Sequence, residues 1–204
     1  MKLNGIITAA GLSTRMGVGN FKPLMPLHGK TIIESSVDSM LNVGIRQVIV
    51  VIGHRGNEIE QVLSKREQVV CIYNREYATT DMLASVKKGV SILGDCDAFY
   101  LLPGDMPLIQ TETYYVLKKK MEETDAMLVF PLINGYKKHP PLINSRMKES
   151  ILSFEGRDGL RKLWSQYEDQ TAYVELIDAG CLTDIDTMSD YNMLINKVKR
   201  WDGR

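Results

Sequence analysis

The amino-acid sequence predicts an α/β fold, a Rossmann-like, doubly wound three-layer sandwich with a mostly parallel sheet. Continuous apolar runs recur along the chain, as is typical of strands that are buried on both faces. Segments with helical spacing and capping residues separate these runs. Because a strand–helix–strand unit closes as a right-handed crossover, the alternation predicts parallel strands with helices on both faces. The 204 residues have the length of one ordinary domain, which we place at 1–204.

The first half of the chain contains the most regular elements. The predicted strands are the apolar runs Leu3–Thr8, Gln47–Ile52, Val69–Tyr73 and Ala98–Leu102. The predicted helices between and after them are Thr31–Asn42, Asn57–Lys65, Asp81–Leu93 and Thr111–Glu123. The first helix is the best marked, because Thr31 and Glu34 have the spacing of a capping box and Gly44 follows its end.

The second half begins with a fifth predicted strand, Ala126–Leu132, after which the alternation breaks. Asn134–Gly135 predicts a tight turn, and His139–Ile143 predicts an extended segment added to the sheet. The remaining predicted elements are the helices Arg146–Ser153, Arg157–Tyr167 and Met188–Lys199 and the strands Ala172–Ile177 and Thr183–Asp186.

Composition and charge exclude several classes of partner. The chain has 25 basic and 25 acidic residues, which argues against a nucleic-acid groove or an anionic membrane surface. No apolar run is long enough to span a bilayer, and the N-terminus leads straight into a core strand rather than a signal peptide. The 3 cysteines are isolated and fit neither a disulfide framework nor a zinc spacing. We therefore expect a cytoplasmic protein with no nucleic-acid and no membrane partner.

The stretch from Gly5 to Lys30 is the first candidate site. Its strand opens into a loop of small residues, which includes Ala9, Ala10, Gly11, Ser13 and Gly17. Small residues let backbone N–H groups approach a phosphate, and Arg15 and Lys22 add positive charge beside them. The loop has neither the P-loop pattern nor the dinucleotide fingerprint. On these residues alone, an ordinary surface loop is the alternative.

Gly104 and Asp105 form a second candidate, directly after the apolar strand that ends near Leu102. In an open α/β sheet, ligands bind beyond the carboxyl ends of the strands, so Asp105 can face phosphates held by the first loop. A carboxylate and a phosphate share a site when a cation lies between them, and Mg²⁺ prefers such oxygen ligands. The alternative is that Asp105 caps the following helix, with Pro107 in its first turn.

Asp184 and Asp186 are the third candidate. Alternate residues of a strand share one face, so the predicted strand would point both carboxylates the same way. Two like charges held together favour a bound cation. The alternative is a surface strand end in which Asp186 or Thr187 caps the last helix.

In combination, these segments resemble the MobA-like nucleotidyltransferase family. The first loop, AAGLSTRMG followed by Lys22-Pro23-Leu24, resembles the family signature, and TAAG is typical of its cytidylyltransferase branch that acts on the molybdenum cofactor. LLPGDMPLI and LTDIDTMSDY resemble the family's GDxP and DIDTPxD segments, with Met188 in place of the proline. Lys138-His139-Pro140 resembles GHP with a lysine in place of glycine, and Asp81 stands where a glycine is common. The resemblance implies the nucleotide-diphospho-sugar transferase fold.

The resemblance also implies roles for individual residues. Arg15, Lys22 and Asp105 would be catalytic, and His139 would contact the acceptor. Asp105 and Asp186, with Asp184, would hold Mg²⁺. The nucleotide would be bound by Ala9, Ala10, Gly11, Leu12, Ser13, Arg15, Lys22, Ser85 and Gly104.

The implied reaction transfers a CMP group from CTP, or a nucleotidyl group from another NTP, to a phosphorylated acceptor and releases pyrophosphate. The implied acceptor is a molybdopterin-type phosphate, the molybdenum cofactor. Two alternatives stay open at this point. One is a sugar- or alcohol-phosphate nucleotidyltransferase, and the other is a protein that binds the molybdenum cofactor or a nucleotide without turnover.

Overall fold

The computed structural model describes residues 1–17, 19–156 and 158–202, with side chains up to residue 196. Its sheet is built around β1 (Leu3–Ala9), which is buried along almost its whole length. β1 pairs in parallel with β4 (Val48–Ile52) on one side and with β6 (Ala98–Pro103) on the other. The apolar runs that predicted these strands are therefore the centre of the sheet.

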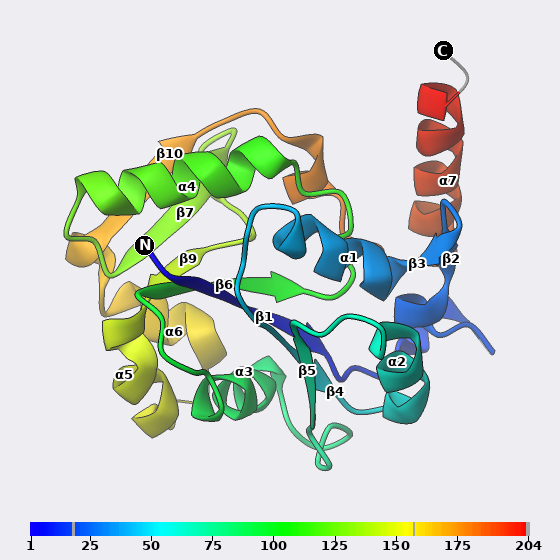
Figure 1. Cartoon of the computed structure of the whole chain (residues 1–204), viewed down its shortest axis with the longest axis horizontal. Coiled ribbons are helices and arrows are strands. Elements are labelled where there is room, and N and C mark those ends of the chain that lie inside the picture. The colour runs from blue at the N-terminus through cyan, green and yellow to red at the C-terminus, as the bar shows by residue number, and fades with distance from the viewer. Residues whose placement is uncertain (18, 157, 203–204) are drawn as a thin grey trace.

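The other strands extend the sheet on both sides (Figure 1). They are β5 (Val69–Tyr73), β7 (Leu128–Ile133), β8 (Tyr136–Lys137), β9 (Leu142–Asn144) and β10 (Thr171–Glu175). The order is β10-β7-β9-β6-β1-β4-β5, with β8 paired to β7. β9 runs antiparallel to β6 and β7, and β8 antiparallel to β7, whereas the other pairings are parallel. The prediction of a mostly parallel sheet is confirmed.

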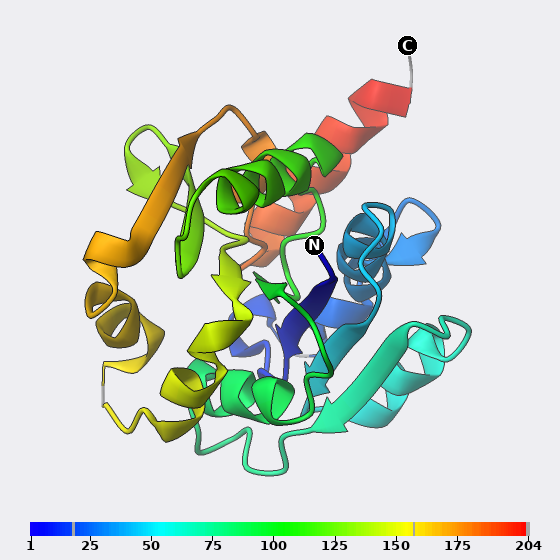
Figure 2. The ribbon, with the colours of Figure 1, turned by 60° about the vertical axis from the view of Figure 1, so that its left-hand side comes forward.

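Helices cover both faces of this sheet, as Figures 1 and 2 show. One face carries α1 (Ile32–Leu41), α2 (Gly56–Leu63) and α4 (Thr111–Glu123), and the other carries α3 (Met82–Ser91), α5 (Lys148–Ser153) and α6 (Gly159–Ser165). Successive side chains of β1 point to opposite faces of the sheet. Ile7 packs into the core beneath α1, α2 and α4, and Ile6 packs into the core beneath α3, α5 and α6. The predicted three-layer, doubly wound arrangement is confirmed.

A short hairpin before α1 escaped the sequence analysis. β2 (Pro26–Leu27) pairs antiparallel with β3 (Lys30–Thr31) through His28 and Gly29, which both have positive φ, the geometry of a tight hairpin turn. The last helix, α7 (Met188–Asp202), packs on this hairpin through buried Leu194 and through the Tyr191 hydroxyl, which donates to the Pro26 carbonyl at 2.7 Å. Its later turns extend beyond the rest of the fold (Figure 1).

Two predicted elements differ from the structure. The predicted strand Thr183–Asp186 does not form, because Ala179–Leu182 is a 3-10 helix and residues 183–187 are irregular. The predicted helix from Arg157 begins at Gly159 as α6, and Arg157 itself lies outside the described residues. Across the part of the chain that the structure describes, no helix is both long and apolar enough to cross a membrane.

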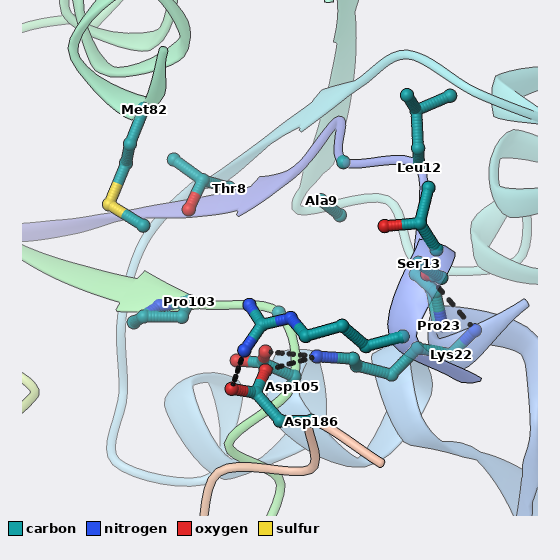
Figure 3. A pocket seen from close by; sticks show the side chains of 14 residues that line it. Thr8, Ala9, Leu12, Ser13, Lys22, Pro23, Met82, Pro103, Asp105 and Asp186 are labelled. Atoms are coloured by element: carbon teal, nitrogen blue, oxygen red, sulfur yellow. Dashed lines mark hydrogen bonds and ion pairs between the residues drawn. The ribbon is translucent and has the colours of Figure 1, made fainter. Parts of the chain in front are cut away.

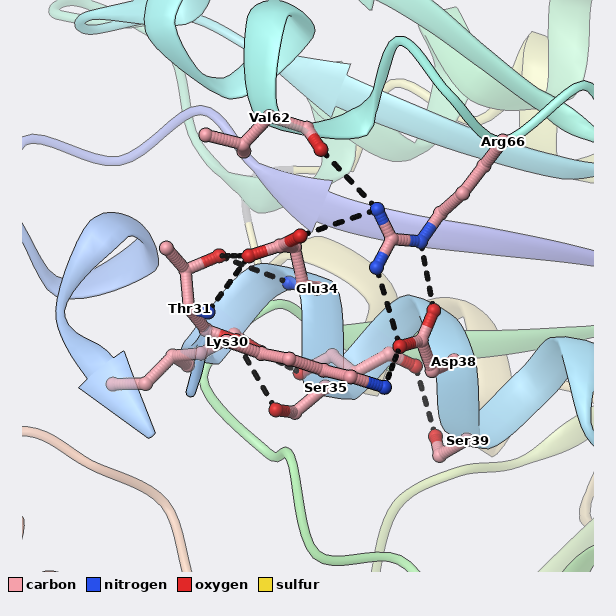
Figure 4. Close-up of polar contacts among 10 residues, drawn as sticks. Lys30, Thr31, Glu34, Ser35, Asp38, Ser39, Val62 and Arg66 are labelled. Carbon is pink, nitrogen blue, oxygen red and sulfur yellow. Dashed lines mark hydrogen bonds and ion pairs between the residues drawn. The ribbon is translucent and has the colours of Figure 1, made fainter. Parts of the chain in front are cut away.

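An ion-pair network fastens α1 to the end of α2 (Figure 4). The Arg66 guanidinium donates to both carboxylate oxygens of Asp38, at 2.7 and 3.2 Å, and to Glu34 at 3.3 Å. Lys30 donates to Asp38 at 2.6 Å, and Glu34 completes the predicted capping box with Thr31. Burial raises the pKa of Asp38, but the hydrogen bonds and charges of Arg66 and Lys30 lower it by more, so it lies below its ordinary value.

Arg66→Ala is expected to lower the free energy of unfolding by about 1–3 kcal/mol at pH 7, because both acids lose a largely buried charged partner. The lowered pKa of Asp38 means that this stabilisation is present above the acid's unfolded pKa and disappears as the pH falls through the folded value. Urea unfolding at pH 7 and pH 3 measures both effects. Lys65→Ala, at the exposed neighbouring position, is the control. Equal unfolding midpoints for Arg66→Ala and the control at pH 7 would contradict the assignment.

Candidate active site

The loop after β1 is held in a fixed shape by its own backbone and side chains. Ser13 has a φ of 55°, and Gly17 and Gly19 also have positive φ, a left-handed conformation that glycine adopts most readily. The Ser13 hydroxyl accepts a hydrogen bond from the Lys22 backbone N–H at 3.3 Å. The two ends of the loop are therefore tied together, and the side chains of Arg15 and Lys22 both reach Asp186.

A cavity of about 320 Å³ lies beside this loop, at the carboxyl ends of β1 and β6 (Figure 3). Its wall contains most of the residues that the sequence singled out. These are Ala9, Gly11, Leu12, Ser13, Arg15, Lys22, Gly104, Asp105 and Asp186. They come from three separate parts of the chain, and the sheet brings them together as expected for an open α/β fold.

Four charged side chains form the floor of the cavity. The Lys22 ammonium donates to Asp105 at 2.8 Å and to Asp186 at 3.0 Å. Arg15 also pairs with Asp186. The Lys22 side chain is only 12% exposed, whereas that of Arg15 is 71% exposed. Lys22 is thus held between two acids in a mostly buried position, whereas Arg15 pairs with one acid and is mostly exposed.

The segment that carries Asp105 is set directly against β1. The Gly104 N–H donates to the Thr8 carbonyl at 2.9 Å. A Cβ on Gly104 would lie 3.1 Å from the Ala9 side chain and 3.2 Å from both Ile33 and the Thr8 oxygen. The close approach accounts for glycine at this position, and it fixes Asp105 opposite the first loop.

Two predicted nucleotide-binding residues, Ala10 and Ser85, do not line the cavity. Ala10 is buried, and its carbonyl accepts a hydrogen bond from the His54 N–H at 3.4 Å. Ser85 is buried in α3, where its hydroxyl accepts a hydrogen bond from Asn74 at 3.2 Å. Both are buried and make hydrogen bonds within the protein, and their direct contact with a nucleotide stays a prediction.

Asp184 and Asp186 come to the site for a different reason from the one the sequence suggested. They do not alternate along a strand, because residues 183–187 form none. Instead, fully buried Ile185 anchors the segment, and its N–H donates to the Asp105 carbonyl at 3.3 Å. Both acids line a second cavity of about 400 Å³ next to the first, and Asp186 also lines the first.

The second cavity continues into a third, of about 650 Å³, and His139 lines both. Within the described residues the buried Nδ1 of His139 has no hydrogen-bond partner. Burial lowers the pKa of His139 below its ordinary value, although a hydrogen bond to the Leu101 carbonyl and the charge of Asp105 act in the opposite direction. The lowered pKa favours the neutral ring, in which one nitrogen can accept a hydrogen bond.

Several lining residues were not foreseen. Met82 borders all three cavities, at the start of α3 after Asp81, whose side chain caps the helix by accepting from the Ala84 N–H at 3.0 Å. Lys138 lines the second and third cavities. The sequence had drawn attention to these positions only as departures from the family pattern. Lys138 stands in place of a glycine, and Asp81, next to Met82, stands where a glycine is common.

The acids of the first cavity fit a divalent cation that arrives with a phosphate. One ammonium lies within 3.0 Å of both Asp105 and Asp186, so a single cation can contact both carboxylates. Among the described residues, no group of three or more His, Cys, Asp or Glu side chains is arranged to hold a metal. One or two carboxylates completed by substrate phosphates is the usual protein environment of Mg²⁺.

Comparison with known proteins agrees with this geometry. Residues 5–171 match the family described as the MobA-like NTP transferase domain. The chain is 31% identical over 186 residues to molybdenum cofactor cytidylyltransferase of Escherichia coli strain K12. The aligned region covers 91% of this chain and 92% of that protein. A nucleotidyl transferase from Methanothermobacter thermautotroptrophicus has a TM-score of 0.82 at 26% identity, covering 98% of each chain. CMP:2-keto-3-deoxy-manno-octonic acid synthetase, solved with CTP, shares the fold with a TM-score of 0.77 at 14% identity, covering 98% of this chain and 99% of the other. This chain belongs to the MobA-like NTP transferase family and is a nucleotidyltransferase by descent.

Proposed function

We propose that this protein is a Mg²⁺-dependent cytidylyltransferase that transfers CMP from CTP to the phosphate of a molybdopterin-type cofactor. The observation that carries the proposal is the cluster of two cations and two acids around one cavity, at the carboxyl ends of β1 and β6. The 31% identity to a molybdenum cofactor cytidylyltransferase supports the donor and the acceptor. The proposal includes a cytoplasmic location, since CTP is a cytoplasmic metabolite.

In this proposal the first loop binds the triphosphate of CTP. The small residues Ala9 and Gly11 leave room for close approach, and a Cβ built on Gly11 would meet no atom within 4 Å. Arg15 and Lys22 turn from their acidic partners toward the phosphates. Their charge then offsets the negative charge that builds up on the α-phosphate and on the leaving pyrophosphate.

Asp105 and Asp186 would hold Mg²⁺, and Asp184 lies beside them in the second cavity. When bound, the ion supplies positive charge to the phosphates and orients them for in-line displacement. The carboxylates position that charge because their loops are fixed to each other and to β1. Lys22, which pairs with both acids in the free protein, would then be available to the phosphates.

The second and third cavities would take the acceptor. Both contain Lys137, Lys138 and His139, so the two spaces adjoin. The third cavity is also lined by Arg161 and by the aromatic rings of Phe130, Tyr136 and Trp164. Positive charge beside the acids and aromatic surface farther out suit an acceptor with a phosphate at one end and a ring system at the other.

The proposed transfer requires no covalent intermediate on the protein. An oxygen of the acceptor phosphate attacks the α-phosphorus of CTP and forms a new P–O bond. The bond between the α-phosphorus and its bridging oxygen to the β-phosphate breaks, and pyrophosphate leaves with that electron pair. Since the attacking oxygen is already ionised, no side chain has to remove a proton, and positioning and charge carry the catalysis.

The test is pyrophosphate release with Mg²⁺ and each of CTP, GTP, ATP and UTP, alone and with molybdopterin cofactor. We expect release only with CTP together with the cofactor. Release with CTP only when a sugar phosphate or an alcohol phosphate is supplied would replace the acceptor and keep the reaction. No release with any pair, together with measurable cofactor or nucleotide binding, would contradict the enzymatic function.

A further inference from the structure

A buried carboxylate outside the cavities joins the two acidic segments of the site. Asp178 is 2% exposed and precedes the 3-10 helix Ala179–Leu182. It lines none of the three cavities described above. Within the part of the chain whose side chains are described, it has no ion-pair partner. Burying an unpaired carboxylate is costly, so its hydrogen bonds have to compensate.

Those hydrogen bonds come from two different parts of the chain. On one side, Asp178 accepts from the Gly180 N–H at 2.7 Å, within its own segment. On the other side, it accepts from the Gln110 N–H at 3.0 Å and from the Thr113 hydroxyl at 2.7 Å, at the start of α4. The Gln110 side chain makes no capping hydrogen bond, so Asp178 supplies from a distance the negative group that this helix start favours.

Two further contacts hold the same pair of segments together. A Cβ on Gly180 would lie 2.0 Å from the Leu108 carbonyl oxygen, so the two backbones touch without room for a side chain. Farther along, the Ile185 N–H donates to the Asp105 carbonyl at 3.3 Å. The segment 178–186 is thus attached to the segment 105–113 at both of its ends.

We infer that Asp178 is the positioning residue that holds the segment bearing Asp184 and Asp186 against the Asp105 segment. The inference rests on the proposed function for its catalytic consequence, but not for the attachment itself. Without Asp178, the start of α4 and residues 179–184 lose one shared anchor, and only the Gly180–Leu108 contact and the Ile185–Asp105 hydrogen bond are left to hold Asp186 in place relative to Asp105. Changes in groups that orient metal-binding side chains typically cost about 10–100-fold in metal affinity or activity.

Two variants of graded severity test this role. In Asp178→Asn an amide replaces an oxygen and cannot accept from every donor, and Thr113→Val removes one donor while keeping the side-chain shape. Thr124→Val is the matched control, because it removes a hydroxyl hydrogen bond at the exposed C-terminal end of α4, the end opposite to the one that Asp178 contacts. Hydrogen exchange of the Ile185 amide measures the attachment, and kcat against KM for CTP measures its catalytic effect.

We expect Ile185 exchange to speed up about tenfold or more in Asp178→Asn, and less in Thr113→Val, with no change in Thr124→Val. We expect kcat to fall about 10–100-fold in Asp178→Asn while KM for CTP stays within about twofold. Unchanged Ile185 exchange in both variants, or an unchanged kcat despite faster exchange, would overturn the inference. If Asp178→Asn does not fold, Thr113→Val decides. If the wild-type protein transfers no nucleotide at all, the proposed function fails and the exchange rates alone decide whether Asp178 anchors the segment.

Discussion

Lys22→Ala is expected to lower kcat for nucleotidyl transfer by about 100- to 1000-fold, the usual effect of removing one group that stabilises charge in a transition state. The Lys22 side chain is only 12% exposed and lines the first cavity, where we propose that the triphosphate binds. Its loss leaves Arg15 as the remaining cation of the four charged groups on the cavity floor. Steady-state kinetics with CTP and the acceptor measure the effect, and a circular dichroism spectrum checks the fold.

Lys2→Ala is the matched control for that variant. Lys2 also pairs with an acid, Asp95 at 2.9 Å, but it lies at the opposite end of β1 and is more than half exposed. Its removal is expected to leave kcat within about twofold, since an exposed ion pair contributes little. If the Lys22→Ala variant has the same kcat as the Lys2→Ala variant, Lys22 has no part in the mechanism.

Nucleotide and divalent cation are expected to strengthen each other's binding by about tenfold or more. In the free protein, Lys22 and Arg15 neutralise Asp105 and Asp186. A metal ion alone must displace an ammonium, and a nucleotide alone must draw the cations from their acids. When both bind, the carboxylates and the cations each find new partners, so the two binding free energies are coupled.

Titration with Mn²⁺, followed by electron paramagnetic resonance with and without CTP, measures this coupling directly. Lys22→Ala is expected to bind Mn²⁺ more tightly than the wild-type protein when no nucleotide is present, because nothing competes for the two acids. Asp105→Ala is expected to lose both the coupling and the metal-dependent release of pyrophosphate. Equal Mn²⁺ affinity with and without CTP in the wild-type protein, or undiminished pyrophosphate release by a folded Asp105→Ala variant, would contradict the metal assignment.

Much of the fold could be predicted because the signals are local. Strands such as Val48–Ile52 are buried on both faces and therefore appear as unbroken apolar runs. The capping box at Thr31 marks the start of α1 in the sequence and is present in the structure. The hairpin Pro26–Thr31 was missed because its strands have two residues each, too few for any periodicity.

The candidate site was predictable only where its residues follow strands directly. Arg15, Lys22 and Asp105 belong to loops at the ends of β1 and β6, so the parallel sheet brings them together. Asp186 reaches the site through the tertiary contacts of Ile185 and Asp178, which no local pattern reports. The same holds for Lys138 and Met82, whose place between cavities depends on how β8 and α3 pack.

The central claim, that the α-phosphate of CTP moves to a phosphorylated acceptor, is tested most directly by following labelled phosphorus. CTP labelled at the α-phosphate and CTP labelled at the γ-phosphate are each incubated with the protein, Mg²⁺ and molybdopterin cofactor. The account predicts that the α-label appears in the cofactor as a bound CMP group and that the γ-label appears only in pyrophosphate. Transfer of the γ-label to the cofactor, or recovery of the α-label only as free CMP, would contradict it.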